Sequence, residues 1–451
     1  MSFVQALVHP EDLVALVKFK FLGGAESVTP RVNLSTLDKP LQVCYQLLKR
    51  TSRSFAVVIQ ALDEELRDAV CLFYLVLRAL DTVEDDMTIT SAEKIPLLKK
   101  FHEFLDDPTW SYSKSSCKDG VVLERFPVIS NEYRRLKPAF RDVIKDITAR
   151  MGAGFCIYLE KEVSTLADWD EYCHFAAGLV GVGLSQLFAA SGLEDVSVAT
   201  STELSNSMGL FLQKTNIIRD YLEDVNDNRH FWPREVWSQY APNIGDFRKR
   251  EMSAPAVACL NHLITNALSH VPDVIAYLSQ LKNQSIFNFC AIPQVMAIAT
   301  LARCYNNHNV FTGVVKIRKG EACSMMMEST NMEKTVEIFN ERILELGGKI
   351  TVTDPSASIT LSSVQNALVL CHSSLQQKGT EASVKPTLKI QLPAVRLDHE
   401  DRVGLYRLRS SRKESRRSLL LSPLLSWTVC LLAVTYQYWG LYLPVQLKDS
   451  L

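Results

Sequence analysis

The chain lacks several patterns that mark common protein classes. Its 451 residues carry 49 basic and 50 acidic side chains, a formal net charge of -1, so bulk electrostatics do not indicate a nucleic-acid partner. Its 11 cysteines include no Cys-x-x-Cys spacing, which favours reduced, buried thiols in the cytosol over a disulfide framework. No Gly-x-Gly-x-x-Gly motif follows a strand pattern, so a Rossmann nucleotide-binding domain is not indicated.

Strand patterns and a secretory signal are also scarce. Alternation of strand type is confined to short stretches near residues 312–318 and 387–396, and the N-terminus has no basic stretch followed by an apolar run. Helical spacing of apolar residues instead covers five long stretches: residues 40–105, 130–190, 200–225, 250–280 and 284–346. We therefore expect an all-α protein with a single large helical domain.

One long apolar run lies near the C-terminus. Residues 419–443 are 25 positions without a charge, and a helix needs about 20 to cross a bilayer. Basic residues crowd positions 402–417 before this run, which predicts a tail anchor with the body of the protein in the cytosol. A buried core helix is the alternative, because Pro423 and Gln437 weaken the span. The shorter run at residues 286–299 predicts a core helix.

Two acidic clusters interrupt apolar helical patterns, and on a helix each gathers three carboxylates: Asp81, Glu84 and Asp85 in the first, and Asp220, Glu223 and Asp224 in the second. Like charges at this spacing repel by roughly 0.2 to 0.5 kcal/mol per pair unless a cation lies between them. Magnesium usually takes one or two carboxylates and fills its other positions with water and phosphate oxygens. The two clusters therefore suggest a diphosphate held through magnesium.

The residues that share a face with these clusters support a binding site. Tyr74 and Arg78 precede the first cluster on its helical stripe, and Gln213, Asn216 and Arg219 precede the second. A single Asp-x-x-x-Asp is usually a solvated polar face, which is the alternative interpretation. A mixture of phenol, guanidinium, amide and carboxylate groups suits an anion and its metal ions better than an ordinary surface does.

A glycine-rich helical stretch follows Tyr172 and includes Gly178, Gly181 and Gly183. Each glycine costs about 1 kcal/mol relative to alanine in a helix, so something must approach closely at these positions. Two explanations stay open: tight packing against another helix, or a ligand groove lined by missing side chains.

Over about residues 35–340 the chain resembles the squalene synthases, farnesyl-diphosphate farnesyltransferases of animal type. The resemblance is carried by four strings of residues: Arg53-Ser54-Phe55, residues 74–86 (YLVLRALDTVEDD), residues 213–224 (QKTNIIRDYLED) and residues 315–320 (VKIRKG). It implies a helical bundle of the isoprenoid synthase type with a central cavity. It also implies head-to-head condensation of two farnesyl diphosphates to presqualene diphosphate and NADPH-dependent reduction to squalene, with magnesium, in sterol biosynthesis.

The resemblance further assigns roles to single residues. Magnesium would be held by Asp81, Glu84, Asp85, Asp220 and Asp224. The NADPH phosphates would lie near Arg53, Arg78, Arg219, Lys316 and Arg318. Ser54, Phe55, Tyr74, Gln213 and Asn216 would contact substrate. Tyr172 would act in the first half-reaction, and Phe289 would stabilise a cation in the second, with plain core packing as its alternative.

These inferences together predict five segments: an N-terminal extension (1–35), the catalytic domain (36–346), an irregular linker with a basic end (347–418), the membrane anchor (419–443) and a short tail (444–451). The resemblance to the squalene synthases weakens after about Arg342. We expect a monomer on the endoplasmic reticulum membrane, with its catalytic domain facing the cytosol.

Three other functions remain open from the sequence. A condensing prenyl synthase without reduction would form its product independently of NADPH. A metal-dependent prenyl diphosphate hydrolase would release farnesol whatever the cofactor. A noncatalytic membrane-tethered scaffold would tolerate loss of the acidic clusters.

Overall fold

The structure, a computed structural model, describes residues 9–21 and 28–377. Within these ranges the regular secondary structure is entirely helical, so the all-α prediction is confirmed there, and residues 312–318 form no strand. The predicted membrane anchor and the apolar stretch near residues 387–396 lie outside the described residues.

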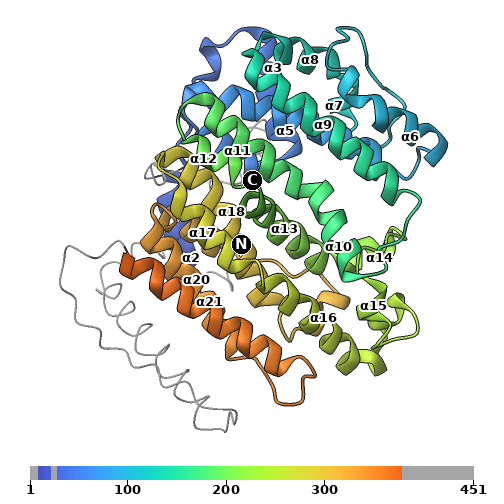
Figure 1. Cartoon of the computed structure of the whole chain (residues 1–451), viewed down its shortest axis with the longest axis vertical. Helices are drawn as coiled ribbons and strands as arrows, with labels where there is room; N and C mark the ends of the chain where they lie inside the picture. The colour runs from blue at the N-terminus through green and yellow to red at the C-terminus, as the bar shows by residue number, and fades with distance from the viewer. Residues whose placement is uncertain (1–8, 22–27, 378–451) are drawn as a thin grey trace, which may run out of the picture. The chain divides into compact units, whose positions relative to one another are not determined.

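Twenty α-helices are described (Figure 1): α2 (Pro10–Phe21), α3 (Lys39–Thr51), α4 (Arg53–Gln60), α5 (Glu64–Asp85), α6 (Ser91–Lys100), α7 (Val121–Glu124), α8 (Phe126–Arg135), α9 (Pro138–Tyr158), α10 (Leu166–Cys173), α11 (Leu179–Ser191), α12 (Val196–Thr200), α13 (Thr202–Arg219), α14 (Tyr221–Asn226), α15 (Arg234–Trp237), α16 (Ser253–Leu268), α17 (Val271–Gln280), α18 (Gln284–Cys304), α19 (Lys319–Glu328), α20 (Met332–Gly347) and α21 (Ala357–Gln377).

Helix α5 is central to the packing because its apolar stripe faces several neighbours at once. The side chains of Leu72, Val76, Ala79, Leu80 and Val83 are all buried, as the helical spacing predicts. The helix packs against α3, α8, α9 and α11. Its polar stripe is therefore carried on a rigid element, and the first acidic cluster lies in the last turn of that element.

Helix α18 confirms the prediction of a core helix for residues 286–299. Two described helices have the length and composition of a membrane span, Leu166–Ser191 and Gln284–Cys304. The second is mostly buried by neighbouring helices, including α13, α17 and α20, which explains its apolar composition without a membrane.

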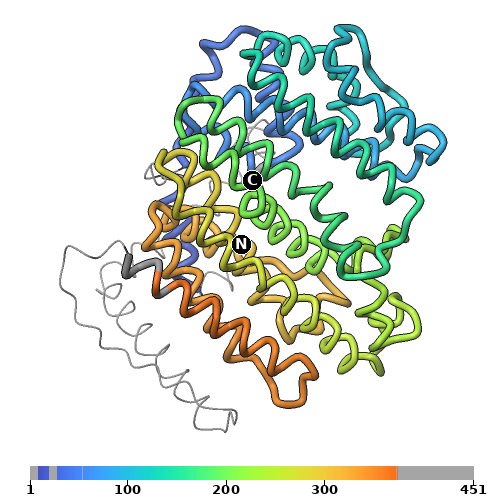
Figure 2. Tube along the Cα trace, in the orientation of Figure 1, coloured from blue at the N-terminus to red at the C-terminus, as the bar shows by residue number. Residues whose placement is uncertain are grey.

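Helices α10 and α11 are joined by one π-helical turn at His174–Gly178, and together they form the 26-residue rod seen in Figure 2. Such turns inside a helix often occur at functional sites. This turn begins two residues after Tyr172.

The glycines after Tyr172 allow close packing of helices. A Cβ atom on Gly181 would lie 2.1 Å from the carbonyl oxygen of Ser205 in α13, and one on Gly209 of α13 would lie 2.2 Å from that of Ala177. Gly183 instead makes room for Ile147 and Phe73. Of the two explanations left open by the sequence, helix packing therefore accounts for these positions.

The predicted irregular linker needs a correction in its described part. Residues 357–377, inside the interval 347–418, form α21, which packs against α16, α17 and α20. Thr265 of α16 and Thr360 of α21 share a buried hydrogen bond of 2.6 Å between their hydroxyl groups. The helical period was missed because Ser, Thr, Gln and Asn dilute the apolar residues, and Ser, Thr and Asn are weak helix formers. The other domain boundaries stay predictions.

The ten described cysteines are all free, and eight of them are buried. This agrees with the expected reduced thiols.

Candidate functional site

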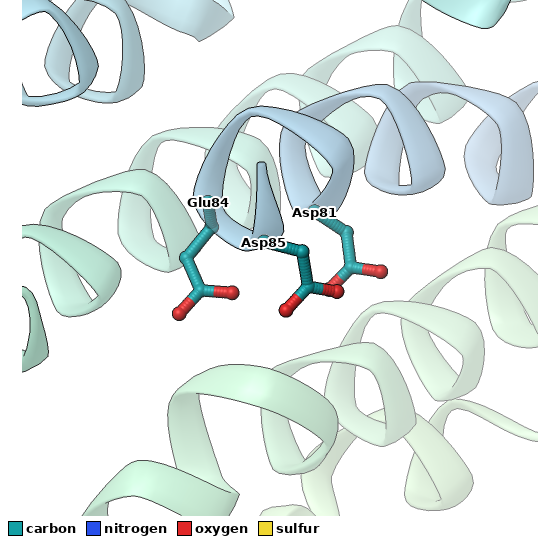
Figure 3. A group of neighbouring side chains, drawn as sticks. All are labelled: Asp81, Glu84 and Asp85. Carbon is teal, nitrogen blue, oxygen red and sulfur yellow. The ribbon is translucent and has the colours of Figure 1, made fainter. Parts of the chain in front are cut away.

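The first acidic cluster lies at the C-terminal end of α5. Asp81, Glu84 and Asp85 each offer a carboxylate oxygen, and these oxygens all lie within 4.8 Å of one another. Figure 3 shows the three carboxylates pointing to the same side of the helix, towards green segments of the chain. Hard oxygen ligands this close together can share a divalent cation.

The end of α5 is fixed by groups that do not belong to the cluster. Asp86 caps the helix and accepts hydrogen bonds from the Thr88 amide (2.8 Å) and the Ser115 hydroxyl (2.6 Å). Buried Lys94 donates to the backbone carbonyl of Glu84. Asp86 therefore has a structural role, and the three preceding carboxylates are left to face the site.

The polar stripe above the cluster forms a connected row. Arg78 donates to Asp81 at 2.7 Å and to the Tyr74 hydroxyl at 3.4 Å. The ring of Phe55, in α4, lies 6.1 Å from that of Tyr74. The structure thus brings together three of the predicted site residues beside the first cluster, while neighbouring Ser54 is exposed.

The second cluster is divided between two helices. Asp220 ends α13 with φ -93° and ψ 14°, and α14 starts at Tyr221 and carries Glu223 and Asp224. Arg219 donates to the carboxylate of Asp220 at 2.7 Å. The sequence predicted one continuous helix here, so the break is a correction, although both aspartates still belong to the same local structure.

Arg229 joins the two acidic clusters directly, and sequence reasoning missed it. Its guanidinium binds Asp85 of the first cluster and also lies 3.1 Å from Asp224 of the second. The two clusters therefore face one common region, although 144 positions separate Arg229 from Asp85 in the sequence. A lone arginine after an acidic helix carries no pattern that would reveal such a contact.

The site concentrates negative charge where water is partly excluded. Burial, followed by repulsion from Asp85, raises the pKa of Asp81 to about 6, and the same two causes raise the pKa of Glu84 well above its ordinary value. Burial, with Asp220 and Asp85 nearby, raises the pKa of Asp224 to about 7 despite Arg229. The side chain of Asp81 keeps 34% of its exposure, so bound cations can still reach it. A cation between the clusters would relieve this repulsion.

Tyr172 lies beside the first cluster. Its ring stacks on Phe231 at 4.9 Å and meets Tyr158 edge-on at 5.2 Å. Burial, followed by the charges of Glu84, Asp85 and Asp81, raises the pKa of Tyr172 well above its ordinary value. Its phenol is therefore protonated at neutral pH, which suits donation of a hydrogen bond better than removal of a proton.

The remaining predicted substrate and cation-stabilising residues lie at different depths. Gln213 is half-buried and Asn216 is exposed, both on α13 before the second cluster. Phe289 is buried in α18, and its ring meets Phe188 edge-on at 6.1 Å. Phe289 thus has a core contact, as its alternative interpretation expected, and that contact leaves its predicted role untested.

The predicted cofactor residues are not brought together by the described contacts. Lys316 is exposed, whereas Arg318 is bound 2.5 Å from the buried carboxylate of Asp12 and 3.4 Å from Glu321. In the described part of the chain, no contact links either residue to Arg78 or Arg219. The side chain of Arg53 lies outside the described residues. Arg318 is engaged by Asp12 as Arg78 is engaged by Asp81. All five cofactor assignments therefore stay predictions.

Comparison with known proteins gives a consistent result. A family model described as squalene/phytoene synthase matches residues 48–321. The squalene synthase of Rattus norvegicus is 56% identical over 366 residues, which cover 81% of this chain and 88% of the rat protein. The squalene synthase of Homo sapiens is 58% identical over 360 residues, covering 80% and 86% respectively.

A solved structure adds the fold to this agreement. The complex of TcSQS with the ligand E5700 superposes with a TM-score of 0.74 and 46% identity, covering 75% of this chain and 100% of that one. The complex with the ligand BPH1237 superposes with a TM-score of 0.73. The chain therefore belongs to the squalene/phytoene synthase family of prenyl-transferring enzymes, and within it to the animal squalene synthase type.

Proposed function

We propose that this chain catalyses the head-to-head condensation of two farnesyl diphosphates to presqualene diphosphate and the reduction of this intermediate to squalene, with magnesium and NADPH. The carrying observation is the contact of Arg229 with Asp85 and Asp224, because it makes the two acidic clusters parts of one site. A diphosphate bound between the two clusters would be contacted from both sides. Because the diphosphate and the carboxylates are all negatively charged, cations would be needed between them.

The residues present fit magnesium. Asp81, Glu84 and Asp85 would hold it on one side and Asp220 and Asp224 on the other, since all five offer hard oxygen ligands. Bound magnesium would neutralise the charge that develops on the departing diphosphate. Arg78, Arg219 and Arg229 carry fixed positive charge in the same region and would stabilise that diphosphate as the allylic cation forms.

Tyr172 would act at the allylic end of the substrate. Its protonated phenol, held between Phe231 and Tyr158, could donate a hydrogen bond to the leaving diphosphate. The aromatic faces around it are apolar and electron-rich, and they would stabilise a carbocation while water is excluded. We also propose that the ring of Phe289 stabilises a carbocation in the second half-reaction.

The cofactor and membrane assignments rest on the family. NADPH phosphates would use Arg53, Arg78, Arg219, Lys316 and Arg318, and Arg318 also forms an ion pair with Asp12. The predicted anchor would place the enzyme on the endoplasmic reticulum membrane, with its catalytic domain in the cytosol.

The experiment that tests the proposal is a product analysis. The full chain in detergent, supplied with farnesyl diphosphate and magnesium, is expected to yield squalene when NADPH is present and presqualene diphosphate when it is omitted. Lipid extraction followed by mass spectrometry measures both products. Condensation product that never becomes squalene would favour a synthase without reduction, and farnesol alone under both conditions would favour a hydrolase.

A further inference from the structure

A buried lysine lies in the middle of α13, the helix that leads to the second acidic cluster. The side chain of Lys214 is only 1% exposed. Its ammonium nitrogen lies 2.5 Å from the Asp170 carboxylate, 2.7 Å from the Asn266 amide oxygen and 2.9 Å from the His270 imidazole. Lys214 thus donates hydrogen bonds to Asn266 and His270, and its contact with Asp170 is an ion pair.

The lysine also fixes the orientation of the groups around it. Because an ammonium can only donate, Nε2 of His270 must accept, so its Nδ1–H donates to the Ser207 hydroxyl at 2.7 Å. Ser207 in turn donates to Asp273 at 2.7 Å. Burial, with Lys214 nearby, lowers the pKa of His270 to about 3, which keeps the ring neutral. The donor and the acceptor of each hydrogen bond from Lys214 to Asp273 are therefore fixed.

The network connects elements that carry the proposed chemistry. Asp170 lies on α10 two residues before Tyr172, and Lys214 lies on α13 six residues before Asp220. The Lys214 ammonium also lies 4.9 Å from the ring of Trp169, next to Asp170. The pair thus ties the tyrosine-bearing helix to the helix that leads to the second cluster.

Stability alone is a weak reason for this arrangement. Replacing a buried charged group and its partner by apolar residues is often neutral for stability, so the burial of Lys214 points to the geometry that its contacts impose. The geometry at stake is the position of Tyr172, because the π-helical turn after it interrupts the regular helix.

We propose that Lys214 is a positioning residue: by holding Asp170, it fixes Tyr172 relative to the two acidic clusters during condensation. The inference rests on the proposed function. It requires that the loss of Lys214 slows the chemical step and leaves substrate binding largely intact, because the carboxylates and arginines that bind the diphosphate are unchanged.

The test compares Lys214→Met, Asp170→Asn and the double variant of the full chain by steady-state kinetics of condensation. Small misplacements of reacting groups can cost about 100-fold in rate. We expect kcat to fall about 10- to 100-fold for Lys214→Met and about 10-fold for Asp170→Asn, with KM changed less than about 3-fold. The double variant is expected to be no slower than Lys214→Met, since both changes break one link.

Asn261→Ala is the matched control. Asn261 lies on α16, and the substitution removes its buried 2.7 Å hydrogen bond to Asp354. We expect its thermal unfolding temperature to fall while its kcat stays within about 2-fold of the unsubstituted chain. The side chain of Asp170 is 49% exposed, so we expect Asp170→Asn to fold. This variant is therefore informative even if Lys214→Met does not fold.

The proposal is overturned if kcat is unchanged, if kcat falls in the control as it does in the variants, or if the two single losses multiply in the double variant. Failure of the unsubstituted chain to condense farnesyl diphosphate would instead contradict the proposed function.

Discussion

Replacement of both Asp81 and Asp85 by asparagine is expected to lower the rate of product formation by about 1,000-fold or more. The amide keeps the size of each side chain but removes the charge that would hold magnesium and, through it, the diphosphate. Loss of a single group that stabilises developing charge costs about 100- to 1,000-fold in other enzymes, and two are removed here. The measurement is the initial rate of condensation with saturating magnesium.

The chain offers a closely matched control for this change. Asp142 and Asp146 have the same four-residue spacing on α9, and both are exposed. Asparagine at both positions is expected to leave the rate within about 2-fold, since a surface ion pair such as Asp146 with Arg150 contributes little. Equal rates for the two double variants would contradict a role of Asp81 and Asp85 in condensation, and no product from the unsubstituted chain would support the noncatalytic scaffold.

Removal of divalent cations by a chelator is expected to abolish condensation and also to lower thermal stability in a pH-dependent way. Without a cation, burial and repulsion raise the pKa of Asp81 to about 6 and of Asp224 to about 7, above the ordinary value near 4. A group with a raised folded-state pKa contributes stability below its unfolded pKa, and that contribution is lost as pH rises through the folded pKa. The chelated protein should therefore lose stability between about pH 4 and 7.

The measurement is thermal unfolding with magnesium and with chelator at pH 5 and pH 8. Magnesium is expected to raise the unfolding temperature more at pH 8, where the carboxylates are ionised, than at pH 5, where protons compete for them. The Asp81→Asn, Asp85→Asn variant should lose most of this difference. An equal increase at both pH values in the unsubstituted chain would contradict a cation bound by these clusters.

Much of the fold and of each cluster could be predicted because the signals are local. The buried stripe of α5 and the carboxylates of its last turn follow from helical period, and α18 follows from its apolar composition and length. The glycines of α11 predicted that another group lies close to this helix. Only the structure shows that the group is Ser205 of a neighbouring helix and not a ligand.

What could not be predicted depends on contacts between distant segments or on weak local signals. Nothing in the sequence places Arg229 against Asp85, and the break at Asp220 lies inside a pattern that fits one uninterrupted helix. The ion pair of Arg318 with Asp12 of α2 joins residues 306 positions apart, and no local signal indicates it. Helix α21 was missed because uncharged polar residues are mixed among its apolar ones, and apolar Ile359 and Val369 are themselves exposed, which obscures the helical period.

In the proposed function, the two acidic clusters together bind one diphosphate through magnesium. A crystal structure of the full chain with magnesium and a non-ionising thio analogue of farnesyl diphosphate tests it most directly. We predict metal ions between the diphosphate and the carboxylates of both clusters, Asp81 and Asp85 on one side and Asp220 and Asp224 on the other. A diphosphate bound elsewhere, or held by basic residues with no metal at either cluster, would contradict the account.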